Sequence, residues 1–160
     1  MKIYFATDHA GYEMKEVLIK YVRDELGYEV EDMGAHRLDS TDDYTDFVHK
    51  AAGKVSSDPA NSRAIVLGAS GQGEAIVANR HSEVRAVVYY GEPTSPQVDA
   101  SGKELGMIES TREHNDANVL SLGARFLTME EARRVVKLWL STEFTGQARH
   151  SRRISKIDNE

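Results

Sequence analysis

Short β-prone runs alternate along this chain with segments of helical periodicity, and this alternation restricts the possible folds more than any other feature of the sequence. Strands that alternate with helices form a parallel sheet with helices on both faces and right-handed crossovers. The predicted strands cover residues 2–7, 28–33, 64–68, 84–90 and 118–123. The predicted helices cover about residues 12–26, 44–57, 73–81, 129–141 and 147–157.

We therefore predict an α/β fold, a Rossmann-like three-layer α/β/α sandwich around a five-stranded parallel sheet. The length of 160 residues suits a single domain, residues 1–160. One helix start has a clear signature, the capping box Thr128-x-x-Glu131. The connection 91–111 is unusually long and holds two of the three prolines. It is either a functional segment or a surface excursion.

Composition excludes several classes of function. The chain has no cysteine, which rules out disulfides, thiolate metal sites and a cysteine nucleophile, and which fits a reducing compartment. The net charge of −6 argues against a general nucleic-acid binder. No apolar run approaches the roughly 20 residues of a membrane helix, and the first residues do not have the pattern of a signal peptide. We therefore expect a cytoplasmic protein without a membrane or nucleic-acid partner.

The stretch GASGQGE follows the third predicted strand and resembles two phosphate-binding loops without matching either. Gly68 and Gly73 have the spacing of a P-loop, but Glu74 stands where that loop has its lysine. Gly71 and Gly73 begin the dinucleotide-binding pattern, but Ile76 stands where the third glycine belongs. The loop therefore carries a carboxylate where both known patterns have another residue type.

A carboxylate at this position has a chemical interpretation and a structural one. Glycines let the backbone approach a ligand closely, and the N–H groups that begin the next helix can bind an anion. The positive end of the helix dipole favours the ionised form of Glu74. An ionised carboxylate beside N–H donors can take a proton α to a carbonyl while the N–H groups hold the enediolate oxygen. The alternative is a favourable N-terminal glutamate after a tight turn.

Other polar residues are expected on the same rim of the sheet. Ligand sites in parallel sheets lie outside the carboxyl ends of the strands, which places Asp8 and His9, the glycine loop and the segment after Tyr90 together. An Asx turn is the alternative role for Asp8. His114 and Asn115 precede the last predicted strand, where an Asn-rich turn is ordinary. No pair of histidines has the spacing of a zinc site, so no metal is expected.

The basic C-terminal segment is the third candidate. Arg149 and Arg153 are four residues apart and therefore share one helical face. Two guanidinium groups so placed suit a phosphate monoester. The alternatives are a solvated helix C-terminus and a weak nucleic-acid patch. Together, the three candidates suggest a ligand that is a small phosphorylated carbonyl compound.

The chain resembles the ribose-5-phosphate isomerase B family, within a broader group that includes the galactose-6-phosphate isomerase subunits. The resemblance rests on the motifs TDHAGYEMK, DMGA, DDYTDF, GASGQGEAIVANR, REHNDANVLSLGAR and ARHSRRISKI, in this order and spacing. The family has two catalytic styles. One uses a cysteine at the end of the third strand, and the other uses a glutamate a few residues later. Gly68 occupies the cysteine position here, so Glu74 places this chain in the second style.

The resemblance implies a role for each matching residue. Glu74 would carry the proton between C2 and C1, and Ser70 would help to move protons at the substrate oxygens. Asp8 and His114 are both candidates for opening the furanose ring. Phosphate contacts are implied for four residues, which are His9, Arg125, Arg149 and Arg153. The remaining contacts, to the sugar hydroxyls or the enediolate, are implied for Tyr44, Gly71, Gln72, Gly73 and Asn115.

The resemblance thus implies an aldose–ketose isomerase that interconverts ribose 5-phosphate and ribulose 5-phosphate without a cofactor. A hexose-6-phosphate isomerase, of the allose or galactose 6-phosphate type, and a non-catalytic sugar-phosphate-binding protein are the alternatives. Active sites in this family lie between subunits, so we expect a homodimer or a dimer of dimers with shared sites. Residues 146–160 are expected to pack on the partner. The insertion 91–111 is expected to be ordered and to form one wall of the substrate pocket.

Overall fold

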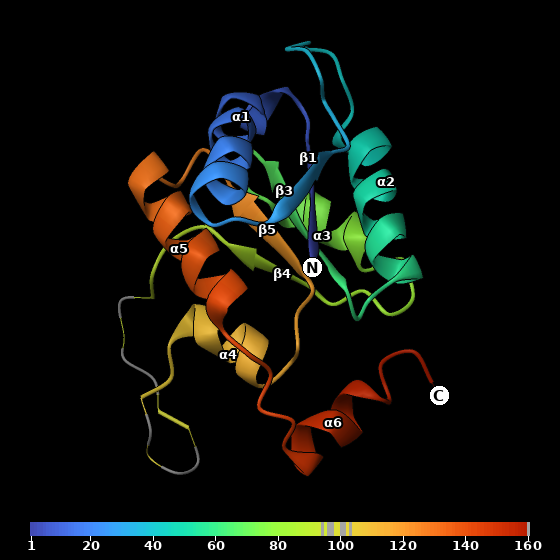
Figure 1. Ribbon diagram of the computed structural model, residues 1–160, viewed down its shortest axis with the longest axis vertical. Coiled ribbons are helices and arrows are strands. Elements are labelled where there is room, and N and C mark those ends of the chain that lie inside the picture. The colour runs from blue at the N-terminus through green and yellow to red at the C-terminus, as the bar shows by residue number, and fades with distance from the viewer. Residues whose placement is uncertain (94, 96–97, 100–101, 103, 160) are drawn as a thin grey trace.

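The computed structural model describes residues 1–93, 95, 98–99, 102 and 104–159, and it has a five-stranded, wholly parallel sheet at its centre (Figure 1). The strands are β1 (Lys2–Thr7), β2 (Glu29–Asp32), β3 (Ser62–Gly68), β4 (Ala86–Tyr89) and β5 (Val119–Gly123). Their spatial order is β2-β1-β3-β5-β4. The predicted Rossmann-like fold is therefore confirmed.

The strand order locates the site. The chain runs outward from β1 to β2 and then returns to the other side of β1 to form β3, so the winding reverses between β1 and β3. In open parallel sheets, ligands bind at such a reversal, outside the carboxyl ends of the strands. The register pairs Thr7 with Leu67, and Leu67 with Leu122. The loops that follow β1, β3 and β5 therefore leave the sheet side by side.

Helices cover both faces of the sheet. On one face lie α2 (Tyr44–Ser57) and α3 (Gln72–Ala78), and on the other lie α1 (Tyr12–Lys20), α4 (Met107–Glu113) and α5 (Met129–Ser141). The residues of β3 alternate between the two cores. Ile65 and Leu67 pack with the residues of α1 and α5, whereas Ala64 and Val66 pack with those of α2 and α3. A strand buried on both faces needs apolar residues at every position, which is what the run AIVL provides.

Most predicted element boundaries hold within a few residues. The Thr128 hydroxyl oxygen accepts the N–H of Glu131 at 3.2 Å, which confirms this half of the predicted capping box. The predicted helix 12–26 is interrupted. Its α-helical part ends at Lys20, and residues Tyr21–Glu25 continue as a single π-helical turn. The predicted helix 147–157 is shorter, forming α6 (Ala148–Ile154).

The connection 91–111 contains a helix that the sequence pattern did not reveal. Its last part belongs to α4, and Ile108 is only 2% exposed within the core formed with α5. At its start, the Arg134 guanidinium pairs with the Glu92 carboxylate at 2.5 Å. Between them, Val98 and Glu104 form an isolated antiparallel bridge. Residues 94, 96–97, 100–101 and 103 lie outside the described part of the chain, so the order expected of the whole insertion stays a prediction.

Replacement of Ile108 with Ala should show that α4 is part of the core. We expect a loss of about 2–4 kcal/mol in the free energy of unfolding, because a fully buried branched side chain leaves a cavity. Met107, the neighbouring residue on the same helix, is 36% exposed, so Met107→Ala should cost much less. Urea unfolding of both variants measures the difference. Equal losses would mean that α4 is only loosely attached.

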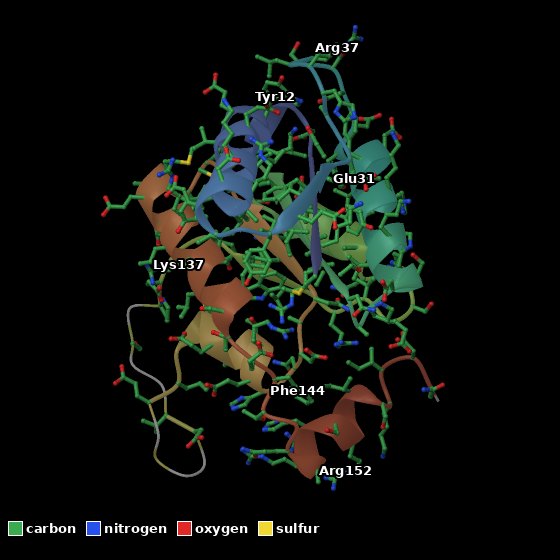
Figure 2. The ribbon with its side chains drawn as sticks, viewed as in Figure 1. Tyr12, Glu31, Arg37, Lys137, Phe144 and Arg152 are labelled. Atoms are coloured by element: carbon green, nitrogen blue, oxygen red, sulfur yellow. The ribbon has the colours of Figure 1, made fainter. Side chains whose placement is uncertain are left out.

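The short helix α6 lies apart from the sheet (Figure 1). Only His150 among its residues is buried, and Ile154 is half-buried. Figure 2 shows Arg152 at one end of the longest axis of the molecule and Arg37, in the loop before α2, at the other. No helix in the described ranges is long and apolar enough to cross a membrane.

Candidate active site

A pocket of about 250 Å³ opens where the winding of the sheet reverses, between the loops that follow β1 and β3. It is lined by Asp8, Tyr44, Ala69, Ser70, Gly73 and Glu74. A larger hollow of about 470 Å³ lies beside α3 and the edge strand β4, but it is lined mainly by apolar and amide side chains and contains no carboxylate or imidazole. The smaller pocket is therefore the candidate for proton-transfer chemistry. It brings together five residues predicted from the sequence, which are Asp8, Tyr44, Ser70, Gly73 and Glu74.

Glu74 is a buried carboxylic acid at the start of α3. Its residue is only 4% exposed, and this burial raises the pKa of its carboxyl. The negative charge of Asp8 raises the pKa further, while the backbone N–H of Glu74 acts in the opposite direction. A carboxylate with a raised pKa is a stronger general base than an ordinary one.

Gly68 makes room for this carboxylate. A Cβ atom at Gly68 would overlap all three atoms of the Glu74 carboxyl group, Oε1, Cδ and Oε2. The absence of a side chain at Gly68 and the inward orientation of Glu74 are therefore linked by steric exclusion. A residue with a side chain at position 68, cysteine included, could not coexist with this placement of Glu74.

The glycine loop is shaped by two further close approaches. Gly71 has a φ of 77°, a left-handed conformation that glycine adopts without strain, and its carbonyl accepts the Ser121 hydroxyl at 2.6 Å. A Cβ atom at Gly73 would lie 2.8 Å from the Tyr44 hydroxyl, so Tyr44 packs over the first turn of α3. The Ser70 hydroxyl oxygen accepts the N–H of Gln72 at 3.4 Å. The N–H of Ala75 donates to the carbonyl of Gly71 at 3.1 Å, and the N–H groups that precede it at the start of α3 have no intrahelical acceptor.

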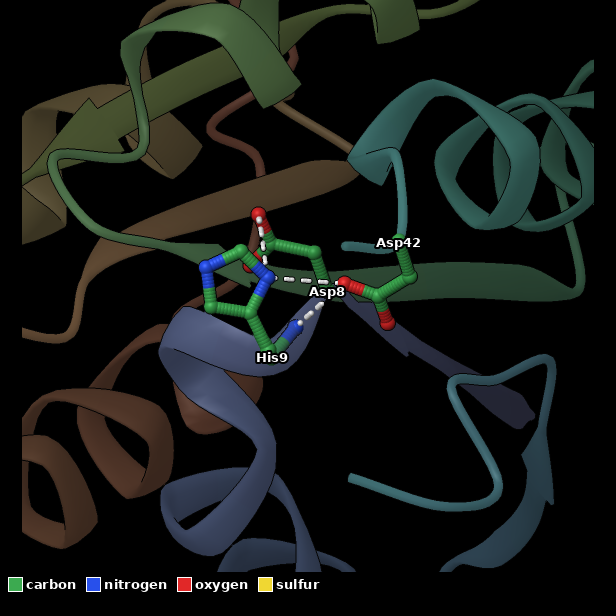
Figure 3. A group of neighbouring side chains, drawn as sticks. All are labelled: Asp8, His9 and Asp42. Atoms are coloured by element: carbon green, nitrogen blue, oxygen red, sulfur yellow. Dashed lines mark hydrogen bonds and ion pairs between the residues drawn. The ribbon is translucent and has the colours of Figure 1, made fainter. Parts of the chain in front are cut away.

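Asp8 lines the pocket at the end of β1, and the next residue, His9, lines a neighbouring hollow. The Asp8 carboxylate accepts the N–H of Ala10 at 2.9 Å, so the predicted Asx-type turn is present. Asp8 still lines the pocket, so its turn role and its site role coexist. The His9 ring lies between the carboxylates of Asp8 and Asp42, with Nδ1 3.9 Å from the former and 2.8 Å from the latter (Figure 3).

These three side chains are close enough together to be considered as a metal site. Their potential ligand atoms lie within 4.8 Å of one another, a spacing that one ion could bridge. However, Asp42 Oδ1 accepts both the backbone N–H of His9 and its ring nitrogen Nδ1. A proton on Nδ1 occupies the position that a metal ion would need, so the group is better described as a triad in which a hydrogen bond joins His9 to Asp42 and the Asp8 carboxylate lies 3.9 Å from Nδ1.

Arg125 lies close to this triad. Its backbone N–H donates to the carbonyl of Ala69 at 3.2 Å, which attaches the segment after β5 to the glycine loop. Its exposed guanidinium is near enough to His9 to lower the pKa of that imidazole, in opposition to the stronger effect of Asp42, which raises it. A guanidinium and an imidazole thus lie near each other beside Asp8, a pair that suits a phosphate.

Four predicted site residues lie elsewhere in the chain. His114 and Asn115 precede β5, and the Asn115 carbonyl accepts the Arg85 side chain just before β4, so both lie at the amino ends of the strands. The His114 ring stacks on His150 of α6, with centroids 4.5 Å apart. Arg149 and Arg153 are exposed on α6. A single chain therefore holds these residues at the edge opposite Glu74.

Sequence reasoning missed two residues that support the site. Asp42 appeared only as the first residue of the motif DDYTDF, without a role of its own, yet it holds His9 by two hydrogen bonds. Ser121 appeared only as a strand residue, yet its hydroxyl fixes the carbonyl of Gly71. Both contacts link segments more than thirty residues apart. A polar residue inside the apolar run of β5 was the one available signal.

Comparison with known proteins gives a consistent result. The family described as Ribose/Galactose Isomerase has a sequence model that matches residues 3–157. A ribose-5-phosphate isomerase B from Mycobacterium tuberculosis is 36% identical over 154 residues, covering 96% of this chain and 86% of that protein. A putative sugar phosphate isomerase from Bacillus subtilis is 35% identical over 159 residues, covering 99% and 96%.

Solved structures agree with the sequence comparisons. The crystal structure of ribose-5-phosphate isomerase B from Mycoplasma genitalium with bound ribulose-5-phosphate superposes with a TM-score of 0.84 at 31% identity, covering 98% of this chain and 93% of that one. The ribose-5-phosphate isomerase B of Clostridium thermocellum gives 0.83 at 37% identity, covering 99% and 95%.

Proposed function

This chain belongs to the ribose/galactose isomerase family, and from that premise we propose that it interconverts ribose 5-phosphate and ribulose 5-phosphate. The observation that carries the proposal is the buried Glu74 carboxylate, which shares one pocket with Asp8 and Ser70. Simple binding of a sugar phosphate would not need a buried base. The non-catalytic alternative is therefore disfavoured.

The proposed reaction proceeds through an enediolate. Glu74 takes the proton from C2 of the open-chain aldose, the C2–H electron pair forms the C1–C2 double bond, and negative charge develops on O1. Backbone N–H groups of Gly71, Gln72, Gly73 and Glu74 stabilise that charge, together with Asn115. Glu74 then returns the proton to C1, while Ser70 assists the transfer of the hydroxyl proton from O2 to O1. No cofactor is needed, because the electrons stay within the substrate.

Opening of the furanose ring requires an acid or base near the ring oxygen. Asp8 lines the pocket of its own chain, so it is the candidate that a single chain supplies. His114 lies at the opposite edge and could act only from a partner subunit. Both assignments therefore stand as proposals, with different requirements for assembly.

We propose that the site is completed by a second copy of the chain, in a homodimer or a dimer of dimers. The pocket of one chain contains the base but lacks two of the four expected phosphate ligands. The missing ligands, Arg149 and Arg153, lie on α6, a helix whose residues are mostly exposed. A helix that buries so little of its own surface is a natural element for packing on a partner. Residues 146–160 would thus deliver arginines to the neighbouring pocket.

Mixed oligomers should reveal shared sites. An Arg153→Ala chain and a Glu74→Gln chain are each expected to be nearly inactive, because one lacks a phosphate ligand and the other lacks the base. After subunit exchange, a mixed dimer contains one pocket with intact Glu74 and intact Arg153, so part of the activity should return. Recovery is measured after co-refolding, with exchange verified by differently tagged chains. If exchange occurs without recovery, each chain builds its own site.

The substrate itself is tested by a panel of pentose and hexose phosphates in deuterated water. We expect aldose–ketose exchange to be fastest with ribose 5-phosphate, with solvent deuterium entering at the transferred position. Faster turnover of allose 6-phosphate or galactose 6-phosphate would favour the hexose alternative. Binding of all sugars without exchange would favour a sensor. We further propose a cytoplasmic location, which the absence of cysteine supports.

The insertion 91–111 is proposed to form one wall of the substrate pocket, either in its own chain or in a partner subunit. None of its described residues lines the 250 Å³ pocket of the same chain. Its start is attached to α5 through Glu92, and its end is part of the core through Ile108.

A further inference from the structure

Two hydrogen bonds to Asp42, which lies in the loop before α2, hold His9 in place. Asp42 Oδ1 accepts the backbone N–H of His9 at 3.0 Å and its ring nitrogen Nδ1 at 2.8 Å. Figure 3 shows the resulting arrangement, in which one carboxylate oxygen fixes both the main chain and the ring. With the main chain and χ1 constrained together, the imidazole has little freedom to rotate.

The contact also determines which ring nitrogen carries a proton. A carboxylate oxygen only accepts hydrogen bonds, so Nδ1 must be the donor. Nε2, on the ring edge away from Asp42, is then the atom left to meet a ligand (Figure 3). When the ring is cationic, Nε2 also carries a proton and becomes a charge-assisted donor for an anion.

The charges around His9 favour that cationic form. The hydrogen bond that His9 donates to Asp42 is the main cause of a raised pKa for His9, and the negative charge of Asp8 adds to it. Burial and the positive charge of Arg125 act in the opposite direction. Glu13 shares a neighbouring hollow with His9 and contributes a further negative charge on that side.

Hydrogen bonds within the loop before α2 fix the position of Asp42. Asp39 accepts the backbone N–H and the hydroxyl of Thr41, and its carbonyl accepts the N–H of Asp42. The Asp42 side chain is only 11% exposed, and its second oxygen, Oδ2, is buried without a hydrogen-bond partner in the described part of the chain. An unpartnered carboxylate oxygen is costly to bury. A residue that only held this loop in place for folding could be a neutral amide, so the negative charge of Asp42 indicates a role beyond folding.

We propose that Asp42 is a positioning residue that holds His9 with Nδ1 protonated and Nε2–H directed to the substrate phosphate. The phosphate part of this inference rests on the proposed isomerase function. The position of the ring and its proton does not, because both follow from the contacts of Asp42 alone. Asp42 touches neither the pocket that holds Glu74 nor the reacting carbons, so it should act on binding more than on turnover.

Two variants separate the charge from the contact. Asp42→Asn keeps the size and an acceptor oxygen but removes the charge, whereas Asp42→Ala removes both. Asp46→Asn is the matched control, since it makes the same charge change at an exposed position four residues away. Thermal unfolding of each protein tests the fold. If Asp42→Ala fails to fold, Asp42→Asn alone still decides the question.

The first measurement is an NMR titration of the imidazole nitrogens without substrate. We expect the neutral wild-type ring of His9 to carry its proton on Nδ1, and we expect its pKa to lie above that of an ordinary histidine. In Asp42→Asn, the pKa of His9 should fall and the Nδ1–H form should lose its dominance, while Asp46→Asn should leave both unchanged. An unchanged His9 titration in Asp42→Asn would overturn the proposal, whatever the enzyme assays show.

The second measurement is the affinity for inorganic phosphate and the steady-state kinetics. For Asp42→Asn we expect about a tenfold rise in KM and a comparable weakening of phosphate binding, with kcat changed by less than about threefold. The rise in KM should begin at a lower pH than in the wild type, because His9 loses its charge earlier. Unchanged phosphate affinity and KM would overturn the proposal. A wild-type protein with no isomerase activity would instead contradict the proposed function. The NMR titration would then still decide whether Asp42 positions the ring of His9.

Discussion

Replacing Glu74 with Gln is expected to lower kcat at least about 100-fold while the sugar phosphate still binds. Glutamine keeps the shape of the side chain and cannot accept the C2 proton, and loss of a general base has consequences of this order. Steady-state kinetics and a binding titration give the two quantities. Glu130→Gln is a suitable control, because Glu130 is exposed on α5, away from the pocket. Near-normal turnover in the Gln variant would exclude Glu74 as the base.

The pH dependence of the wild type provides a second test of the same assignment. Burial raises the pKa of Glu74 above the ordinary value of 4.5, so the acidic limb of kcat should lie above that value. The same shift has a consequence for stability. The contribution of Glu74 to folding is present below pH 4.5 and is lost as the pH rises through the raised pKa, because the folded state then holds a buried charge. Glu74→Gln removes that charge, so the variant should be at least as stable as the wild type at pH 7.

Introducing one methyl group at Gly68 should also damage catalysis, although less than the loss of the base. In Gly68→Ala the new Cβ occupies the space of the Glu74 carboxyl group, which must then turn away from the pocket. We expect kcat to fall at least about tenfold, with a cost of roughly 1–3 kcal/mol in the free energy of unfolding for overpacking. Gly68 does not have a positive φ, so the alanine backbone itself is not strained.

Two controls show whether Gly68→Ala acts through Glu74. Gly53→Ala adds the same methyl group within α2, where the nearest atom belongs to the His81 ring at 3.8 Å, and it should leave activity unchanged. The double variant of Gly68→Ala with Glu74→Gln should be hardly less active than Glu74→Gln alone. Both changes act through the Glu74 carboxylate, so its removal leaves the methyl group little further effect. Fully multiplicative losses would show that the methyl group disturbs some other part of the site.

The sequence was informative wherever a local pattern decides the outcome. Alternating β-prone runs and helical periodicity predicted the parallel sheet and its two helical layers, because side-chain period depends on a few neighbouring residues. The pattern was weakest for α4, which begins only at Met107 after a connection rich in glycine and proline and has a single deeply buried apolar residue, Ile108. It was also misleading at residue 20, where the helical period continues but the hydrogen bonds change to a π turn.

The sequence alone determined that GASGQGE follows a buried strand, begins a helix and carries a carboxylate at its end. These properties are local, so they can be read from residue types and spacing. Only the tertiary structure decided that Gly68 provides the space for Glu74, that Asp42 holds His9, and that the arginines of α6 lie at the far edge from the pocket. Such relations depend on the order in which strands pair, which brings distant loops together at the carboxyl ends of the sheet and separates others by the length of its strands.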